Sequence, residues 1–418
     1  MIGPADGRAA RPVVGLVIGD LSGSGGMERV HCELIRRLSG RFDFVVLSHT
    51  LEADLSDVVT WHRIPTPRRP AVVAIPLFFA VGSLYAARLD VDILHTCGAI
   101  VGNRAQLSTV HFCHAGFRLA NGGLGPKGAP FERRLNTALM RSFAIAAERW
   151  CYRDKRTEVL GAVSKQTGEE LDAHYRHARV VVTPNGVDVS AFRPDHSVRG
   201  ATRASRGVAP DDVVALFVGG DWERKGLAVA IAGIEEARRR GTAGRLWVLG
   251  LGDEERFRRY AINHGVGDLI DFIGRDSEPA RWFRGADLFL SCSVYETFSL
   301  ATVEAAAAGL PVVSTAVGVA HELVFGGDAD DEQAGVVVER DPLAFGRVIA
   351  TLAKDQRMRE KMGAVGLRRA EAYSWDEVTQ KVGDVYGEIL TRNGARQGLA
   401  GNETQGREPS EVPKGLAS

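Results

Sequence analysis

The feature that most constrains the fold is a regular alternation of short apolar runs and amphipathic stretches along nearly the whole chain. Strand-like runs of the first half are Val13–Ile18, Phe44–Leu47, Asp92–His95, Leu107–Phe112, Val159–Val163 and Val180–Val182. Those of the second half are Val213–Val218, Leu246–Leu249, Leu269–Ile273, Asp287–Ser291, Val312–Thr315 and Gly335–Val338. Helical segments between them include Met27–Leu38, Phe131–Trp150, Ala228–Arg239, Glu254–His264 and Leu343–Leu352. Because such alternation is typical of parallel sheets covered by helices, we predict an α/β fold with two doubly wound, Rossmann-like domains.

A turn-rich segment, Pro184–Asp188, separates the two halves. We therefore predict an N-terminal domain over residues 11–185 and a C-terminal domain over residues 186–373, followed by a final helix at 374–391. Residues 1–10 and 392–418 are polar and lack periodicity, so we expect disordered tails. Ligands of doubly wound sheets bind beyond the carboxyl ends of the strands, so two facing domains would form a cleft.

Composition limits the class of protein. The 418 residues are 45% hydrophobic and 25% charged with a formal net charge of zero, which favours a soluble globular protein and gives no indication of nucleic-acid binding. Five cysteines occur without a CxxC pair, and the first residues lack a signal peptide, so we expect reduced thiols in a cytoplasmic protein.

One long apolar stretch, Pro70–Leu84, is shorter than the ~20 residues that a membrane span needs. We interpret it as a core helix. Three arginines precede it, at positions 63, 68 and 69, which leaves peripheral contact with an anionic membrane as the alternative.

Two glutamates eight residues apart are the strongest indication of a site. Glu296 follows the strand-like run Asp287–Ser291, and Glu304 lies in an Ala-rich segment, Ser299–Ala308, that predicts a helix. Solvated surface charges are the ordinary alternative, but the small residues around Glu304 indicate close packing.

The start of that predicted helix contributes a second kind of group. Phe298, Ser299 and Leu300 stand at its N-terminus, where backbone amide groups attract a phosphate or another anion. A carboxylate beside these amides can bind sugar hydroxyls. The unit thus predicts a site for both ends of a nucleotide sugar.

Two basic residues follow the first strand of the second half. Arg224 and Lys225 stand in a predicted loop after the strand and Gly219, where they can neutralise a diphosphate. A solvated basic pair is the alternative. The strand Leu246–Leu249 is likewise followed by a glycine turn that begins at Gly250.

A glycine-rich turn also follows the first strand of the chain. A dinucleotide-binding fingerprint needs glycine at its first, third and sixth positions, but Glu28 occupies the sixth. NAD binding is therefore disfavoured. A plain turn before a helix is the alternative for Gly25 and Gly26.

Histidines close a further strand of the first half. His111 or His114 could accept a hydrogen bond from an acceptor hydroxyl or hold a donor sugar. Their spacing predicts no metal site.

Together these motifs resemble the family 4 glycosyltransferases, retaining enzymes of the GT-B fold, over about residues 13–390. The segment around Glu296 and Glu304 resembles the Glu-x7-Glu signature of that family, and Gly25–Gly26 resembles its GG-x-E loop. The Arg-Lys-Gly segment and Ala320–His321 resemble bacterial lipopolysaccharide-core glucosyltransferases, which favours a UDP-sugar and leaves GDP-mannose as an alternative. One departure is Gly220, where many members carry arginine.

The resemblance implies a role for each motif. Glu304 would hold the ribose, Glu296 and His111 the donor sugar, and the main chain near Arg275 the nucleobase. Gly25, Gly26, Gly219 and Gly250 would lie close to the donor. The helix at 374–391 would cross back to the first domain. The resemblance also implies metal-independent transfer with retention of configuration and no cofactor beyond the nucleotide sugar. A nucleotide-sugar epimerase and a non-catalytic nucleotide-sugar-binding protein are the alternatives.

Overall fold

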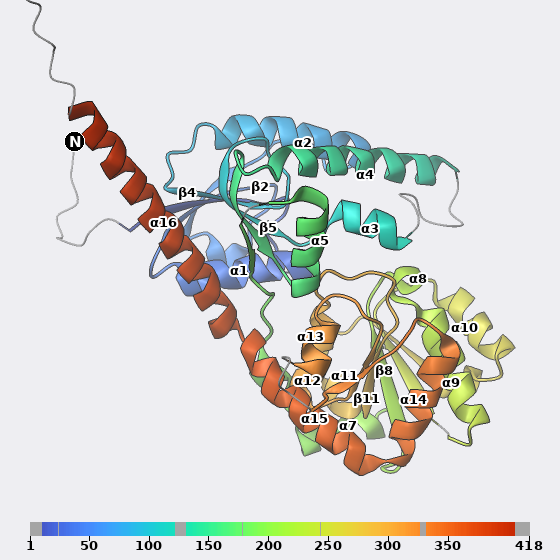
Figure 1. Ribbon diagram of the computed structural model, residues 1–418. Helices are drawn as coiled ribbons and strands as arrows, with labels where there is room; N and C mark the ends of the chain where they lie inside the picture. Colours follow the sequence, from blue (N-terminus) through green and yellow to red (C-terminus); the bar gives the residue numbers. More distant parts are fainter. Residues whose placement is uncertain are drawn as a thin grey trace, which may run out of the picture.

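The computed structural model describes residues 11–23, 25–121, 131–177, 179–242, 244–326 and 332–405. Two parallel sheets form its two halves (Figure 1). The seven-stranded sheet has the order β3-β2-β1-β4-β5-β6-β7. Its strands are β1 (Val13–Val17), β2 (Asp43–Ser48), β3 (Val59–Arg63), β4 (Ile93–Cys97), β5 (Ala105–Val110), β6 (Thr157–Ala162) and β7 (Val180–Val182).

The six-stranded sheet has the order β10-β9-β8-β11-β12-β13. Its strands are β8 (Val213–Val218), β9 (Gly244–Leu249), β10 (Ile270–Gly274), β11 (Leu288–Ser291), β12 (Val312–Ser314) and β13 (Gly335–Val337). The strand order reverses between β1 and β4 and again between β8 and β11, and ligands of doubly wound sheets bind at such positions. The predicted α/β fold with two doubly wound domains is confirmed.

Helices cover both sheets. Those of the first half are α1 (Gly26–Leu38), α2 (Ala71–Ala86), α3 (His114–Asn121), α4 (Phe131–Cys151) and α5 (Lys165–Tyr175). Those of the second half are α6 (Val189–Phe192), α7 (His196–Ala204), α8 (Trp222–Lys225), α9 (Leu227–Arg239), α10 (Glu254–Asn263), α11 (Ala280–Gly285), α12 (Leu300–Ala307), α13 (Ala320–Phe325), α14 (Pro342–Lys354), α15 (Gln356–Ala370) and α16 (Trp375–Gln405). No helix within the described ranges is both long and apolar enough to cross a membrane.

The last helix, α16, joins the two halves. It begins beside the second sheet and runs past α1 (Figure 1). Its residues Val382, Tyr386 and Ile389 belong to the core beneath α1, and Tyr386 is fully buried. The helix continues beyond its expected end near 391 to Gln405, since no proline interrupts the sequence before position 409. The rest of the expected tails, residues 1–10 and 406–418, lies outside the described residues.

The chain crosses between the halves twice at one place. The amide of Val187 donates to the carbonyl of Tyr373 at 2.8 Å, and Val187 forms an isolated parallel bridge with Ser374. A Cβ atom at Gly186 would lie 2.1 Å from the Trp375 ring, so only glycine allows this close crossing.

Two local expectations were wrong. The stretch Pro70–Leu84 forms α2, which lies on the outer surface and is not a core helix, since Val73 is 52% and Leu84 62% exposed. Arg224 and Lys225 lie within the short helix α8 rather than in a loop, because Asp221 caps that helix by accepting from the Arg224 amide.

Candidate active site

The carboxyl ends of the two sheets meet, and both halves contribute to one site. The Thr297 hydroxyl, from the segment after β11, donates to the carbonyl of His111, just after β5, at 2.6 Å. The Leu300 side chain at the start of α12 lies so close to Gly26 that a Cβ atom there would be 2.9 Å from it. Residues predicted separately from the two halves are therefore neighbours.

A carboxylate between two cations forms the centre of the site. Oε1 of Glu296 lies 2.9 Å from Nη1 of Arg224 and 3.2 Å from Nζ of Lys225, and the Ser293 hydroxyl donates to it at 3.0 Å. Burial alone would raise the pKa of Glu296, but Lys225 and Arg224 outweigh burial and hold that pKa below its ordinary value. Glu296 is therefore ionised at neutral pH.

Two glycines make room for Lys225. Gly219 has φ +144°, and a Cβ atom there would lie 2.1 Å from Cδ of Lys225. Gly250 has φ +127°, and its Cβ would lie 2.2 Å from the Gly219 carbonyl oxygen. A side chain at Gly219 would displace the lysine, and one at Gly250 would displace the backbone of Gly219, so both glycines are needed for this arrangement.

A helix N-terminus lies beside this carboxylate. α12 begins after Ser299, whose φ of +74° is rare for a residue with a side chain, and Ser299 provides no side-chain cap. Such an uncapped terminus favours an anion. Phe298 is buried beneath it and packs edge-on against Tyr373.

Glu304 lies one turn into α12. Its side chain is only 12% exposed, and burial raises the pKa of Glu304 despite the opposing effects of Arg29 and Lys225. Nη2 of Arg29, from α1, lies 3.8 Å from Oε1 of Glu304. Glu296 thus lies between cations of its own domain, whereas Glu304 lies near a cation of the opposite domain.

The glycine turn of the first half shapes the other wall. A Cβ atom at Gly25 would lie 1.9 Å from a carboxylate oxygen of Glu28, so Glu28 folds back over the turn. This is the position where a dinucleotide-binding loop has its third glycine.

The two predicted histidines differ in environment. The His111 ring contacts His31 at 5.1 Å, and its Nε2 is buried with no hydrogen-bond partner among the described residues. Burial, reinforced by His31 and His95, lowers the pKa of His111 well below its usual value, so its ring is neutral. By contrast, Nδ1 of His114 lies 2.8 Å from the buried carboxylate of Glu148. His111 thus has a buried ring nitrogen without a partner among the described residues, whereas Nδ1 of His114 is engaged by Glu148.

Arg275 directly follows β10 and is exposed. The preceding Gly274 accepts a hydrogen bond from the Gly250 amide at 2.7 Å. Arg275 therefore lies at the same edge of the sheet as Gly250, although the structure gives it no contact with the two glutamates.

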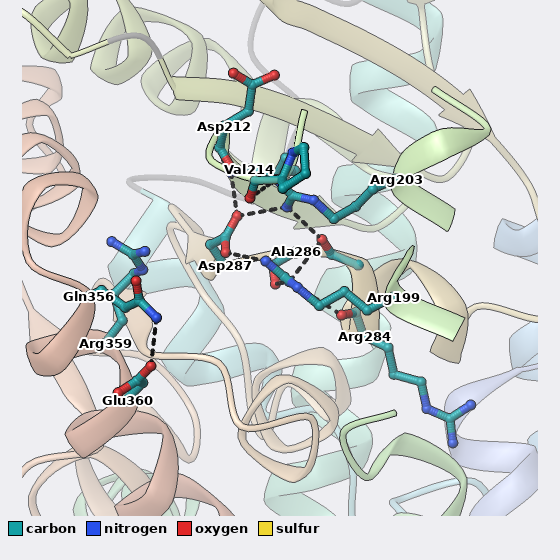
Figure 2. A network of polar contacts seen from close by, with 12 residues as sticks. Arg199, Arg203, Asp212, Val214, Arg284, Ala286, Asp287, Gln356, Arg359 and Glu360 are labelled. Carbon is teal, nitrogen blue, oxygen red and sulfur yellow. Dashed lines mark hydrogen bonds and ion pairs between the residues drawn. The ribbon is translucent and has the colours of Figure 1, made fainter. Parts of the chain in front are cut away.

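A separate cavity of about 570 Å³ lies at the opposite, amino edge of the second sheet. Figure 2 shows the ion-pair network beside it, in which Asp287 accepts from Arg199 at 2.6 Å, from Arg203 at 3.0 Å and from the Val214 amide at 2.8 Å. Because these pairs tie α7 to the ends of β8 and β11, we assign the network to the stability of the fold.

Comparisons with known proteins agree with the geometry. Residues 24–191 match the family described as Glycosyltransferase Family 4, and residues 212–355 match Glycosyl transferases group 1. A D-inositol 3-phosphate glycosyltransferase of Xylanimonas cellulosilytica is 30% identical over 324 residues, which are 73% of this chain and 74% of that protein. The chain belongs to the family 4 glycosyltransferases.

Other members of the family align less completely. A D-inositol 3-phosphate glycosyltransferase of Streptomyces avermitilis is 29% identical over 308 residues, which cover 69% of this chain and 62% of that relative. The chain thus spans less than two thirds of that relative's length.

Solved structures show the same fold. The glycosyltransferase WaaG of lipopolysaccharide biosynthesis matches with a TM-score of 0.71 and 19% identity, over 89% of this chain and 99% of WaaG. Anabaena Alr3699/HepE in complex with UDP and glucose matches with a TM-score of 0.68 and 16% identity, over 90% and 100%. The resemblance to GT-B glycosyltransferases is confirmed.

Arg29 is one residue of this family 4 site that the sequence did not single out. It follows the glycine turn by one helical turn, and it links α1 to Glu304 across the domain boundary. Its position directly after the GG-x-E segment is the sequence feature that could have indicated Arg29 as a site residue.

Proposed function

We propose that this family 4 chain transfers a sugar from a nucleoside-diphosphate sugar to an acceptor hydroxyl with retention of configuration. The observation that carries the proposal is the group of Glu296, Arg224 and Lys225 beside the uncapped start of α12. Two cations and a helix terminus can stabilise a departing diphosphate, as preorganised electrostatics does where charge develops. A carboxylate within reach of the same point can hold the sugar hydroxyls.

The remaining residues fit complementary roles. Glu304 would accept hydrogen bonds from the ribose, and the neutral His111 would contact the donor sugar. The amides that begin at Phe298 and Ser299 would bind phosphate oxygens. The cationic side chains would provide the charge compensation that a divalent metal provides elsewhere. Closure of the domains would exclude water and limit hydrolysis of the donor.

A UDP-sugar is the favoured donor, with GDP-mannose as the alternative. The UDP-bound state of the HepE structure and the resemblance to lipopolysaccharide-core enzymes support this choice. The acceptor would present a hydroxyl on a glycan, a lipid-linked sugar or a small molecule, and the relatives named for D-inositol 3-phosphate make a polyol phosphate one candidate.

Thermal stabilisation by nucleotides tests this proposal. We expect UDP at 100 times its dissociation constant to stabilise the protein by about 2.7 kcal/mol. The shift should be the same with and without EDTA. Equal, negligible shifts with UDP, GDP, ADP and TDP would contradict the nucleotide site, and a shift abolished by EDTA would contradict metal-independent binding.

We also propose that the outer face of the first domain contacts an anionic membrane. α2 and α4 lie side by side there (Figure 1), joined by an edge-on contact between Phe79 and Phe143 at 5.8 Å. α2 carries no charged residue and exposes apolar side chains, and α4 does so along one stripe. The exposed apolar residues are Val73, Ile75, Leu77, Leu84, Phe131, Leu135, Leu139 and Trp150.

Exposed arginines lie near the ends of these two helices. Arg68 and Arg69 precede α2, and Arg88 follows it; Arg149 and Arg153 lie at the end of α4. Apolar side chains framed by cations match the chemistry of anionic headgroups above acyl chains.

A vesicle assay tests the membrane contact. We expect the protein to sediment with phosphatidylglycerol vesicles at low salt and to be released as salt rises, since screening weakens the arginine contribution. Leu77→Glu/Leu84→Glu should abolish sedimentation, whereas Ile262→Glu, an exposed apolar residue on α10, should not. No sedimentation of the wild-type protein would end the proposal.

A further inference from the structure

The segment that carries Glu296 is attached to the first domain on both sides of that residue. Tyr295, immediately before Glu296, is 2% exposed, and its ring packs edge-on against Phe112 at 5.6 Å and Phe117 at 5.5 Å. Its hydroxyl donates to Oε2 of Glu170 on α5 at 2.7 Å and lies 3.2 Å from the Cys113 carbonyl oxygen. A side chain of the second domain therefore occupies a socket in the first.

Thr297, immediately after Glu296, is held as firmly. Its hydroxyl donates to the His111 carbonyl at 2.6 Å. Its own carbonyl accepts from the hydroxyls of Ser164 at 2.7 Å and Thr167 at 3.0 Å, at the start of α5. These bonds fix the backbone around Glu296 to β5 and α5 of the first domain.

Tyr295 also contacts Arg224, which forms with Lys225 the pair of cations that we call the clamp. Nη1 of Arg224 donates to the Tyr295 carbonyl at 2.7 Å and lies 2.9 Å from the Glu296 carboxylate. The side chain of Tyr295 thus points into the first domain, while its carbonyl orients the arginine of the second. A shift of Tyr295 would move both Glu296 and Arg224.

We infer that Tyr295 and Glu170 are positioning residues, which make the geometry of Glu296 and Arg224 depend on contact between the two domains. The inference rests on the proposed function, because it concerns the same donor site. Glu170 is partly buried, and burial raises its pKa while the Tyr295 hydroxyl opposes that rise. If the domains separated, the hydrogen bond would be lost and the aromatic socket exposed. The clamp would then be correctly arranged only when the acceptor-side domain is docked.

The decisive variants remove the hydrogen bond and keep the packing. Tyr295→Phe retains the ring in its socket, and Glu170→Met retains the length of the partner side chain while removing the acceptor. The matched control is Tyr386→Phe, because Tyr386 is also buried and lies 2.7 Å from a ring nitrogen of His95, but within the first-domain core. All three lose one buried hydrogen bond, and only the first two lose it at the domain boundary.

Turnover is measured as UDP release from UDP-glucose in water, and binding as the dissociation constant of UDP. We expect Tyr295→Phe and Glu170→Met to lower kcat about 10- to 100-fold, the effect of a lost hydrogen bond to a charged group. UDP binding should change less than about threefold by the same reasoning, since the cations remain. Tyr386→Phe should keep wild-type kcat. Wild-type kcat in Tyr295→Phe, or equal losses in kcat and UDP affinity, would overturn the inference.

Hydrogen exchange separates this inference from the proposed function. Without any ligand, Tyr295→Phe should exchange faster than wild type at the amides of residues 165–170 and 293–299, and Tyr386→Phe should not. Unchanged exchange there would overturn the inference even if the protein is a transferase. Faster exchange in a protein that is stabilised by none of UDP, GDP, ADP and TDP would refute the proposed function and leave the domain coupling established.

Discussion

Replacing Lys225 with methionine should lower kcat for sugar transfer about 100- to 1000-fold, the range found when one preorganised charge-stabilising group is removed. Nζ of Lys225 lies 3.2 Å from Glu296, beside the place where we propose that the diphosphate departs. A departing diphosphate gains negative charge in the transition state, so the lysine interacts more strongly there than with the bound donor. The loss should therefore appear mainly in kcat, measured with a saturating nucleotide sugar.

Methionine is the informative replacement because the lysine stem is packed. Cδ of Lys225 passes over Gly219 so closely that no side chain fits there, and an unbranched thioether can retain that path. Lys354→Met is the matched control. It removes the same charge from the amino edge of the same domain, where Nζ donates to the Arg240 carbonyl at 2.9 Å. Near-normal transfer by Lys225→Met, or equal losses in both variants, would contradict the assigned role.

The arrangement of Lys225 and Glu296 could be predicted from sequence because it follows from strand order within one domain. Lys225 comes after β8 and Glu296 after β11, and these strands are neighbours at the point where the sheet order reverses. Carboxyl ends of neighbouring parallel strands lie together, so apolar periodicity alone brings the two side chains to one edge.

Contacts across the domain boundary could not be predicted in this way. Arg29 with Glu304 and Tyr295 with Glu170 depend on how two separately folded sheets face each other. No periodicity in either half encodes that orientation. The same limit applies to His114, whose ring is hydrogen-bonded to Glu148 on α4, a segment that the sequence predicted only as a helix.

The surface position of α2 was missed for a different reason. Its stretch is apolar on every side, so the pattern lacks the polar face that distinguishes an exposed helix from a buried one. The φ of +74° at Ser299 was missed as well, because serine at a helix start ordinarily predicts an extended N-cap with a side-chain hydrogen bond. The apolar residues of α2 favour burial, but several of them are exposed. Serine favours a negative φ, but Ser299 has a positive one.

Gly226→Ala should destabilise the C-terminal domain by about 2–5 kcal/mol, from left-handed strain of about 1–2 kcal/mol and overpacking of about 1–3 kcal/mol. Gly226 ends the helix that carries Arg224 and Lys225, with φ +79°, and its Cβ would lie 2.2 Å from the Cys292 carbonyl oxygen. That carbonyl also accepts from Arg340 at 2.9 Å, so it has little freedom to move. The measurement is the free energy of unfolding in urea.

Gly241→Ala separates the two causes. Gly241 has φ +73° near the end of α9, and nothing lies within 4 Å of the Cβ it would gain. It should therefore cost only the left-handed strain, about 1–2 kcal/mol, and leave transfer intact. Gly226→Ala should also lose transfer activity without urea, where most molecules are folded. The clash with the Cys292 carbonyl displaces either Arg224 and Lys225 or the segment that leads to Glu296. Equal destabilisation by the two variants would mean that the close approach of Gly226 to β11 does not hold the clamp in place.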